Sequence, residues 1–444
     1  MSSNISFKHI NKLAIPALIA GISEPILSIT DTAIVGNINV NAVESLAAVG
    51  IVGTFLSMLI WVLGQTRSAI SAIISQYLGA DNLKAVKNLP AQAIFIVTAL
   101  SLLIIVSTYP FAHQIFKLYN ASGLILEYSV VYYKIRVFGF PFTLFTMAVF
   151  GTFRGLQNTY HPMIVAIIGA ATNIILDVIL VYGIPGYLKP MHIEGAAYAS
   201  VIAQLLMALS SAYYLLKKTS IPLIPTFPFN KEIKRFAIMV LNLFVRTLAL
   251  NITLYFATRF ATGYGKNYIA AYTIAINLWF LGAFIIDGYA GAGNIMSGKL
   301  FGGKQYKNLV KLNIKLIKTG LVLGFVLIAI GALIYKPIGL LFTKEPEVLK
   351  QFYNVFWIVL IMQPICAIAF IFDGVYKGLG KMSTLRNVLL AATFLVFIPI
   401  LYGLDYFNFK LSGIFIALTF WMIARALPLL LNFRTQFLPL SKNT

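Results

Sequence analysis

Two acidic residues, Glu24 and Asp31, interrupt an apolar stretch, residues 15–36, that is long enough to cross a membrane as a helix. Their spacing of seven residues puts both on nearly the same helix face, about 10 Å apart along the axis. Because a charge near the bilayer centre costs at least ~2.5 kcal/mol, this face must line a protein interior or a water-filled cavity. We therefore expect these acids to be functional. The alternative is a bent helix whose acids are held by fixed partners.

The same stretch contains two prolines, Pro16 and Pro25. Each proline removes a backbone hydrogen-bond donor and tends to kink a helix, which a bilayer tolerates only with help from neighbouring helices. We predict that both prolines act as hinges of this segment.

A second polar group lies in the apolar run 161–183, where Asn173 and Asp177 are one helical turn apart on one face. Both runs are expected to cross outward, which places Asp31 and Asp177 at the same depth. Two carboxylates and an amide are oxygen ligands suited to a proton or to a hard monovalent cation such as Na⁺. Two adjacent carboxylates cannot both ionise cheaply, so one should hold a proton and release it when water or a cation arrives. This predicts a cation-coupling site. Alternatively, Asp177 only caps or hydrogen-bonds a neighbour.

Further charges inside the apolar runs suggest two ion pairs. Counted from the cytoplasmic ends of the runs, Glu24 and Arg67 lie at similar depth, and so do Arg246 and Asp287. We interpret them as one buried pair repeated with its sign reversed, and as structural rather than transport chemistry. Asp373 lies near the inner end of its run and is expected to reach interfacial water.

The composition excludes a soluble globular protein. Of 444 residues, 59% are hydrophobic and 11% are charged, too few polar side chains to cover a globule. Apolar runs of about 20 residues recur, each long enough to cross ~30 Å of hydrocarbon as a helix. They predict an all-α polytopic membrane protein with twelve transmembrane helices, near 13–35, 51–76, 89–112, 128–153, 161–183, 193–216, 236–260, 268–297, 312–335, 351–377, 384–404 and 411–433.

The formal net charge of +21 comes mainly from Lys and Arg in alternate loops between these runs. This pattern is a positive-inside signal rather than a nucleic-acid site, so we expect the lipid bilayer as a partner and no nucleic acid. It predicts a multi-pass protein of the cell (inner) membrane with both termini in the cytoplasm. The N-terminus runs straight into the first span, so we expect no removable signal peptide. The single cysteine, Cys366, lies in an apolar run and is predicted to serve packing.

An internal repeat appears at a constant offset of 223 residues. It matches four pairs of positions: Pro141 with Pro364, Gly79 with Gly302, Gly155 with Gly378, and Lys12 with Arg235. Since each repeat holds six spans, both halves enter the membrane from the same side. We predict two six-helix bundles related by a pseudo-two-fold axis along the membrane normal: an N-lobe at 1–216, a cytoplasmic linker at 217–235 and a C-lobe at 236–444.

Enzymatic chemistry has little support in the sequence. All four histidines fall in or beside the predicted loops, and there is no HExxH motif, nucleophile elbow or phosphate-binding loop. We therefore expect no catalytic residue, no metal other than Na⁺ at Asp31, Asn173 and Asp177, and no cofactor beyond H⁺ or Na⁺ as coupling ion.

The chain resembles the MATE (multidrug and toxic compound extrusion) transporters, most closely their DinF-like branch. The resemblance covers the whole chain and rests on EPILSITDTAIVG and LAAVG from the first span onward, QYLGADN after the second, FRGLQNTYHP after the fourth, NIILD in the fifth and FDGVYKGLGKMSTLRN around the tenth. It implies a cation-driven antiporter of two six-helix lobes, with substrate in a central cleft that opens alternately to either side.

The resemblance also implies roles for individual residues. Asp31, Asn173 and Asp177 resemble the family's N-lobe proton or sodium site, with Ser200 as a further hydroxyl contributor. Pro16 resembles the proline about which the first span bends. Asp373 matches an acid used in the C-lobe of another branch. The seventh span departs from that branch, since it has Arg246 but no acid.

The leading interpretation is secondary active multidrug efflux of amphipathic, cationic small molecules in exchange for H⁺ or Na⁺ by alternating access, carried out by a monomer. One alternative is a lipid-linked precursor flippase of a related fold, which a strongly cationic cavity favours and the acids of the first span disfavour. Another is a non-transporting membrane scaffold, which requires no ion-sensitive buried acids.

Overall fold

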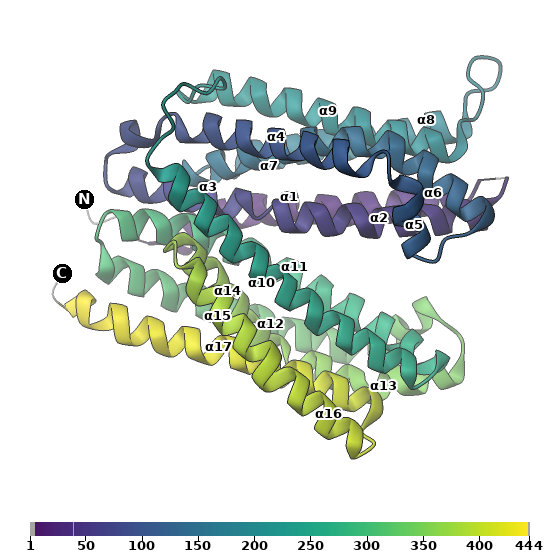
Figure 1. Cartoon of the computed structure of the whole chain (residues 1–444). Helices are drawn as coiled ribbons and strands as arrows, with labels where there is room; N and C mark the ends of the chain where they lie inside the picture. Colours follow the sequence, from purple (N-terminus) through teal and green to yellow (C-terminus); the bar gives the residue numbers. More distant parts are fainter. Residues whose placement is uncertain (1–4, 39, 443–444) are drawn as a thin grey trace. The chain divides into compact units, whose positions relative to one another are not determined.

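The computed structural model describes residues 5–38 and 40–442, with the backbone but not the side chains of residues 23–29. The predicted roles of the Glu24 and Pro25 side chains therefore lie outside the described residues. Within these ranges the chain is a succession of helices, as predicted (Figure 1). Their bounds are α1 Phe7–Gly36, α2 Ala42–Leu63, α3 Thr66–Gly79, η1 Leu83–Val86, α4 Leu89–Thr108, α5 Ala112–Leu118, α6 Gly123–Arg136, η2 Val137–Gly139, α7 Phe140–Gly155, α8 Tyr160–Tyr182, α9 His192–Lys218, α10 Glu232–Gly263, α11 Lys266–Gly302, α12 Tyr306–Phe342, α13 Pro346–Ile361, α14 Gln363–Gly378, α15 Met382–Ala391, η3 Ala392–Phe397, α16 Ile398–Tyr406 and α17 Lys410–Lys442.

Each of the twelve predicted spans falls on one of these helices or on a run of consecutive ones. Among the described residues, 10 helices are long and apolar enough to cross a membrane, or 11 if the bent pair α13 and α14 forms one span. Helix α1 is not in that count, so the number twelve stays a prediction. The all-helical, polytopic membrane fold is confirmed.

Two of the predicted continuous spans are broken. Helix α13 ends at Ile361 and α14 begins at Gln363, with a bend of 50° between them. Pro364 lies in the first turn of α14, where its missing N–H costs nothing, so the helix restarts there. The second span breaks at Gly64, where an added Cβ would lie only 2.7 Å from the sulfur of Met147. The same Cβ would lie 2.5 Å from the backbone carbonyl oxygen of Ile60, so the local backbone as well as α7 favours glycine at this break.

The 223-residue repeat has a structural counterpart in the way helices cross. A Cβ on Gly151 of α7 would lie 2.6 Å from the carbonyl oxygen of Arg67, and one on Gly374 of α14 would lie 2.0 Å from that of Ala290. Both members of the second pair lie 223 residues after those of the first. The prolines also correspond, because Pro141 and Pro364 each lie in the first turn of their helix. The repeated glycines therefore mark the same backbone-to-backbone crossing in each half.

The chain divides into two compact units. Unit 1 comprises residues 1–18, 78–81 and 241–444, and unit 2 comprises residues 19–77 and 82–240. Helix α1 is shared between them. In unit 1 its first part packs on α11, where the Tyr289 hydroxyl lies 3.2 Å from Asn11 Oδ1 and Gly288 faces Leu18. From residue 19 onward, α1 belongs to unit 2.

The segment between α9 and α10, within the predicted linker, belongs to unit 2 and is held against α4 by hydrogen bonds. The Gln92 side chain donates to the carbonyl of Thr226 at 2.6 Å and accepts from the backbone N–H of Asn230 at 2.8 Å. Its backbone is thus fixed at two points despite its prolines.

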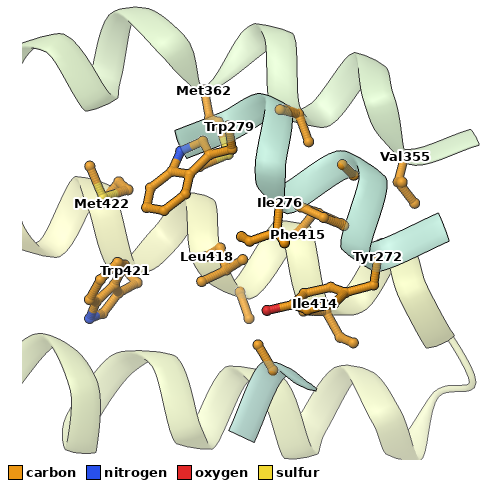
Figure 2. Packing of buried hydrophobic residues seen from close by; sticks show 14 of the residues in the cluster. Tyr272, Ile276, Trp279, Val355, Met362, Ile414, Phe415, Leu418, Trp421 and Met422 are labelled. Atoms are coloured by element: carbon orange, nitrogen blue, oxygen red, sulfur yellow. The ribbon is translucent and has the colours of Figure 1, made fainter. Parts of the chain in front are cut away.

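The hydrophobic core of unit 1 packs aromatic side chains of α11 and α17 against α13 and α14 (Figure 2). Trp279 donates its indole N–H to the sulfur of Cys366 at 3.3 Å, so the buried cysteine packs in this core. Trp421 donates to the hydroxyl of Thr393 at 3.2 Å, inside the π-helical turn η3. This bond fixes the indole ring beside Arg425, four residues further along α17.

Candidate cation-coupling site

The predicted polar residues of unit 2 come together from three helices. Asp31 of α1, Asn173 and Asp177 of α8, and Ser200 of α9 are all buried, with exposed fractions of 6%, 2%, 0% and 4%. Helices α8 and α9 approach closely at Gly195, which has no side chain. An added Cβ there would lie only 2.6 Å from the backbone of Leu180. We call these four residues the acid site.

A chain of hydrogen bonds connects the acid site. The Asn173 amide donates to the Ser200 hydroxyl at 3.3 Å, and this hydroxyl donates to Asp31 Oδ2 at 3.3 Å. Ser200 therefore links α8 to α1 through α9. The sequence predicts one depth for Asp31, Asn173 and Asp177, and the structure brings them together with Ser200 in one cluster.

Four oxygen atoms of the acid site are buried and accept no hydrogen bond from a donor group of the described protein: Asp31 Oδ1, Asn173 Oδ1 and both carboxyl oxygens of Asp177. The carboxyl groups of Asp31 and Asp177 lie close enough to interact with each other. Two ionised carboxylates can only accept hydrogen bonds, so a bond between them requires a proton on one. Oxygens of this kind are the ligands that a proton or a hard cation takes in proteins.

Arg136, at the end of α6, is a charged neighbour of the acid site that was not predicted from the sequence. Its guanidinium acts electrostatically on Asp177 and on Tyr132, which lies one turn earlier on the same helix and is buried. Arg136 lies in the predicted span 128–153, and an intramembrane arginine is itself a signal that could have identified it.

The predicted pair of Arg246 with Asp287 is wrong. In unit 1, Arg246 of α10 forms an ion pair with Asp373 of α14. Asp287 is exposed, whereas Ile286 beside it is fully buried. One residue is a rotation of about 100° around α11, which is enough to turn Asp287 away from the core.

The expectation that Asp373 reaches interfacial water is also wrong. This residue is 8% exposed, and its second carboxyl oxygen lies 2.9 Å from the Lys377 ammonium, four residues further along α14. Arg67, the proposed partner of Glu24, is partly buried, and its Nε atom has no hydrogen-bond partner among the described residues. The pair with Glu24 itself stays a prediction.

A second buried charge missed from the sequence is Arg425 of α17, which is 4% exposed. Its charge acts on Asp373, as do those of Arg246 and Lys377. We call these four residues the basic cluster. Arg425 falls inside the predicted span 411–433, so a search for intramembrane charges would have detected it, although not its partners.

The acid site belongs to only one of the two repeats. The positions 223 residues after Asp31, Asn173, Asp177 and Ser200 hold the apolar residues Leu254, Val396, Ile400 and Ile423. The basic cluster is repeated only at Lys377, whose equivalent is Arg154, since the positions equivalent to Arg246, Asp373 and Arg425 hold Ser23, Phe150 and Ile202. The repeats thus share their helix crossings but not most of their buried charges.

Comparison with known proteins agrees with the fold and with the sequence motifs. A family model described as MatE matches residues 16–179 and 242–402, well over half of the chain. DNA damage-inducible protein F of Escherichia coli (strain K12) is 25% identical over 394 residues, covering 87% of this chain and 84% of its own. Multidrug export protein MepA of Staphylococcus aureus (strain MSSA476) is 25% identical over 351 residues, covering 77% and 74%. A crystal structure of MATE in the bent conformation superimposes with a TM-score of 0.89 at 21% identity, covering 98% of this chain and 96% of that one.

Proposed function

Because the chain belongs to the MatE family, whose members are transporters rather than enzymes, we propose that it is a multidrug efflux transporter driven by protons or sodium ions. It exports amphipathic compounds by alternating access in exchange for the coupling ion. The predicted residence in the cell (inner) membrane, cytoplasmic termini and monomeric state form part of this proposal. The name of the Staphylococcus aureus relative supports the export of drugs.

The observation that carries the coupling role is the charge balance of the acid site. Asp31 and Asp177 together bring two acidic groups, and Arg136 brings one guanidinium, which acts on Asp177. With both acids ionised, one negative charge stays uncompensated in a buried position, which is unfavourable in low dielectric. One proton or one Na⁺ restores neutrality. The site therefore alternates between two charge states that differ by a single monovalent cation.

Helix α1 offers a route from this charge change to a change of shape. It carries Asp31 in unit 2, while its residues up to 18 belong to unit 1. Pro16 and Gly21 lie beside this boundary, where a proline leaves a carbonyl unpaired and a glycine lowers the cost of bending. We infer that loss of the cation from the acid site changes the bend of α1 and so converts one access state into the other.

The charge of the substrate is the finer part of the proposal. An amphipathic cation is the class that the family resemblance implies, and the acid site gives a cationic drug and the coupling ion a common ligand set. Exchange then requires that cation and drug do not both neutralise the site at once, which is the condition for antiport.

The test is efflux of a cationic dye from inverted membrane vesicles with the proton and sodium gradients imposed separately. Asp31→Asn and Asp177→Asn should each abolish coupled export with nearly normal expression, because an amide keeps the shape but cannot exchange a proton. Asp287→Asn is the matched control, since it makes the same change at an exposed acid. Near wild-type efflux in both buried-site variants would rule out the coupling role.

A further inference from the structure

The basic cluster of unit 1 carries more positive charge than its own residues balance. Arg246, Lys377 and Arg425 bring three cations around the one carboxylate of Asp373. The two ion pairs use both oxygens of that carboxylate, one for Arg246 and one for Lys377. Arg425 has no acidic partner within ion-pair distance in the described part of the chain, although its exposed fraction is only 4%.

The guanidinium of Arg425 lies over two aromatic rings. Its guanidinium lies 4.6 Å from the ring centre of Trp421 and 5.6 Å from that of Phe370. Its hydrogen bond within the described structure goes to the sulfur of Met422 at 3.3 Å, a weak acceptor. Trp421 and Met422 both belong to the packed core drawn in Figure 2. Stacking on aromatic rings leaves a guanidinium's five N–H donors in its plane, where they match the two oxygens of a carboxylate or phosphate.

We propose that the basic cluster is a binding site for an oxyanion group, a carboxylate or a phosphate, with Arg425 as its main ligand. The anion supplies the negative charge that the three cations lack. Arg246 and Lys377 contribute to the attraction, and Asp373 competes with the ligand for them. If the ligand is a transported compound, which rests on the proposed function, that compound carries an acidic group, either alone or together with a cationic one.

A purely structural role explains the cluster less well. Cross-linking α10, α14 and α17 through buried polar groups requires balanced charges, because an unpaired buried charge costs several kcal/mol. The pair Arg246–Asp373 alone already joins α10 to α14. Arg425 adds a positive charge near another one, since Arg246 acts on it with the same sign. A ligand site accounts for this arrangement, because the charges become balanced when the anion arrives.

Binding is measured on the purified full chain without any ion gradient, so the result is independent of transport. Succinate and inorganic phosphate are titrated by calorimetry at fixed ionic strength. Anionic lipid is tested separately, in nanodiscs of phosphatidylcholine with and without phosphatidylglycerol. Binding of the soluble anions identifies a soluble ligand, whereas binding of phosphatidylglycerol alone identifies a lipid phosphate as the source. Both outcomes support the oxyanion site, provided that the variants below change them.

Arg425→Gln should weaken anion binding about ten- to a hundredfold, because it removes charge-assisted hydrogen bonds. Arg425→Lys keeps the positive charge but loses the planar set of N–H donors. Its anion affinity should therefore lie between those of Arg425→Gln and the unchanged chain. Arg386→Gln is the control, because Arg386 is partly exposed and bonds only to its neighbour Asn387 among the described residues. It should leave binding unchanged.

Asp373→Asn tests the direction of the change in anion affinity, and this test does not require that the Arg425 variants fold. Removing the competing carboxylate should strengthen anion binding about tenfold. If Asp373 instead binds a cation, this variant leaves anion binding unaltered. The proposal is overturned if no anion binds in either format, or if binding is the same in Arg425→Gln, Asp373→Asn and the unchanged chain. Anion binding with no efflux of any dye would leave this site in place and refute the proposed transport function.

Discussion

Ser200 links both acid-bearing helices of the acid site through hydrogen bonds, because its hydroxyl accepts from Asn173 and donates to Asp31. A hydrogen bond to a charged group contributes about 1.5–3 kcal/mol. In the proposed function, this hydroxyl therefore sets how strongly Asp31 is held in the geometry that receives the coupling ion.

Ser200→Ala should raise the ion concentration needed for half-maximal efflux about tenfold and leave the maximal rate within a factor of about two. Ser211→Ala is the matched control, because Ser211 lies on the same helix, is fully buried and has an oxygen without a partner among the described residues. The measurement is dye efflux against the concentration of the driving ion. Equal curves for the two variants would remove Ser200 from the site.

The acids of the acid site could be recognised in the sequence because an ionisable side chain inside an apolar run has a high free-energy cost. Such a side chain therefore has a partner or a function. Asp31 and Asp177 could be paired because both lie in the outer half of spans expected to cross in the same direction. Arg136 and Arg425 could not be assigned partners, since their neighbours come from helices whose rotation the sequence does not specify. For the same reason Arg246 was paired with Asp287 instead of Asp373.

Glu24 and Arg67 are predicted from the sequence to form a buried ion pair. If the two form a buried ion pair, Glu24→Gln and Arg67→Gln each strand a charge and should each lower stability by about 3–5 kcal/mol. The variant with both residues exchanged should recover part of that loss. Thermal unfolding in detergent measures all three. Additive effects of the two single changes would show that the residues do not interact.

Helix α1 carries the buried Asp31, and its residues are divided between the two compact units. The division follows residue 18, between Pro16 and Gly21. A Cβ added to Gly21 meets no atom within 4 Å, so alanine fits there without strain. Replacing glycine by alanine then acts only on the backbone, where it favours a straight helix by about 1 kcal/mol.

Gly21→Ala should therefore slow turnover several-fold while leaving substrate binding within a factor of about two, as expected for a bias of about 1 kcal/mol on a conformational step. Gly53→Ala in α2 is the matched control, since that helical glycine also has no atom within 4 Å of an added Cβ. Initial efflux rates and dye binding in detergent separate the two effects. A slow Gly53 variant would indicate a general effect of helix propensity instead of a hinge.

Helix ends and helix breaks differ in how well the sequence specifies them. The restart at Pro364 follows from the proline itself, since it lacks an N–H and suits the first turn of a helix. At Gly64 an added Cβ would meet both the carbonyl oxygen of Ile60 and the side chain of Met147 from another helix, and the second of these contacts is not visible in the local sequence. The same limit applies to the π-helical turn of η3, whose Thr393 bonds to Trp421 of α17.

At the scale of the molecule, the repeat separates what the two halves share from what they do not. They share the glycine crossings at Gly151 and Gly374, which fix backbone distances. They differ in buried charge. The acid site has more acidic groups than neighbouring cations, and the basic cluster has three cations around one carboxylate. The shared part was detectable as the 223-residue offset. The difference required side-chain partners, because a pattern of spans does not say which charges meet.

Bending of α1 should change the distance between its outer end and α10. Spin labels at Asn37, just after α1, and at Thr262, near the end of α10, are both placed on exposed positions. The only native cysteine, Cys366, is fully buried and should not take up label. If loss of a cation from the acid site bends α1, the distance distribution between the labels should hold two populations whose ratio reverses between low and high pH. Reversing a tenfold bias takes about 2.7 kcal/mol, within reach of one buried charge.

The Asp177→Asn variant is the internal control for that measurement, because one carboxylate beside Arg136 keeps the charge of the form that holds one proton at every pH. Its distance distribution should match that of the unchanged chain at low pH and stay constant. The Gly21→Ala variant should keep both populations but shift their ratio towards the straight form. Identical distributions at both pH values, in labelled protein that still transports, would exclude bending of α1 as the step that couples ion to substrate, because transport would then proceed without it.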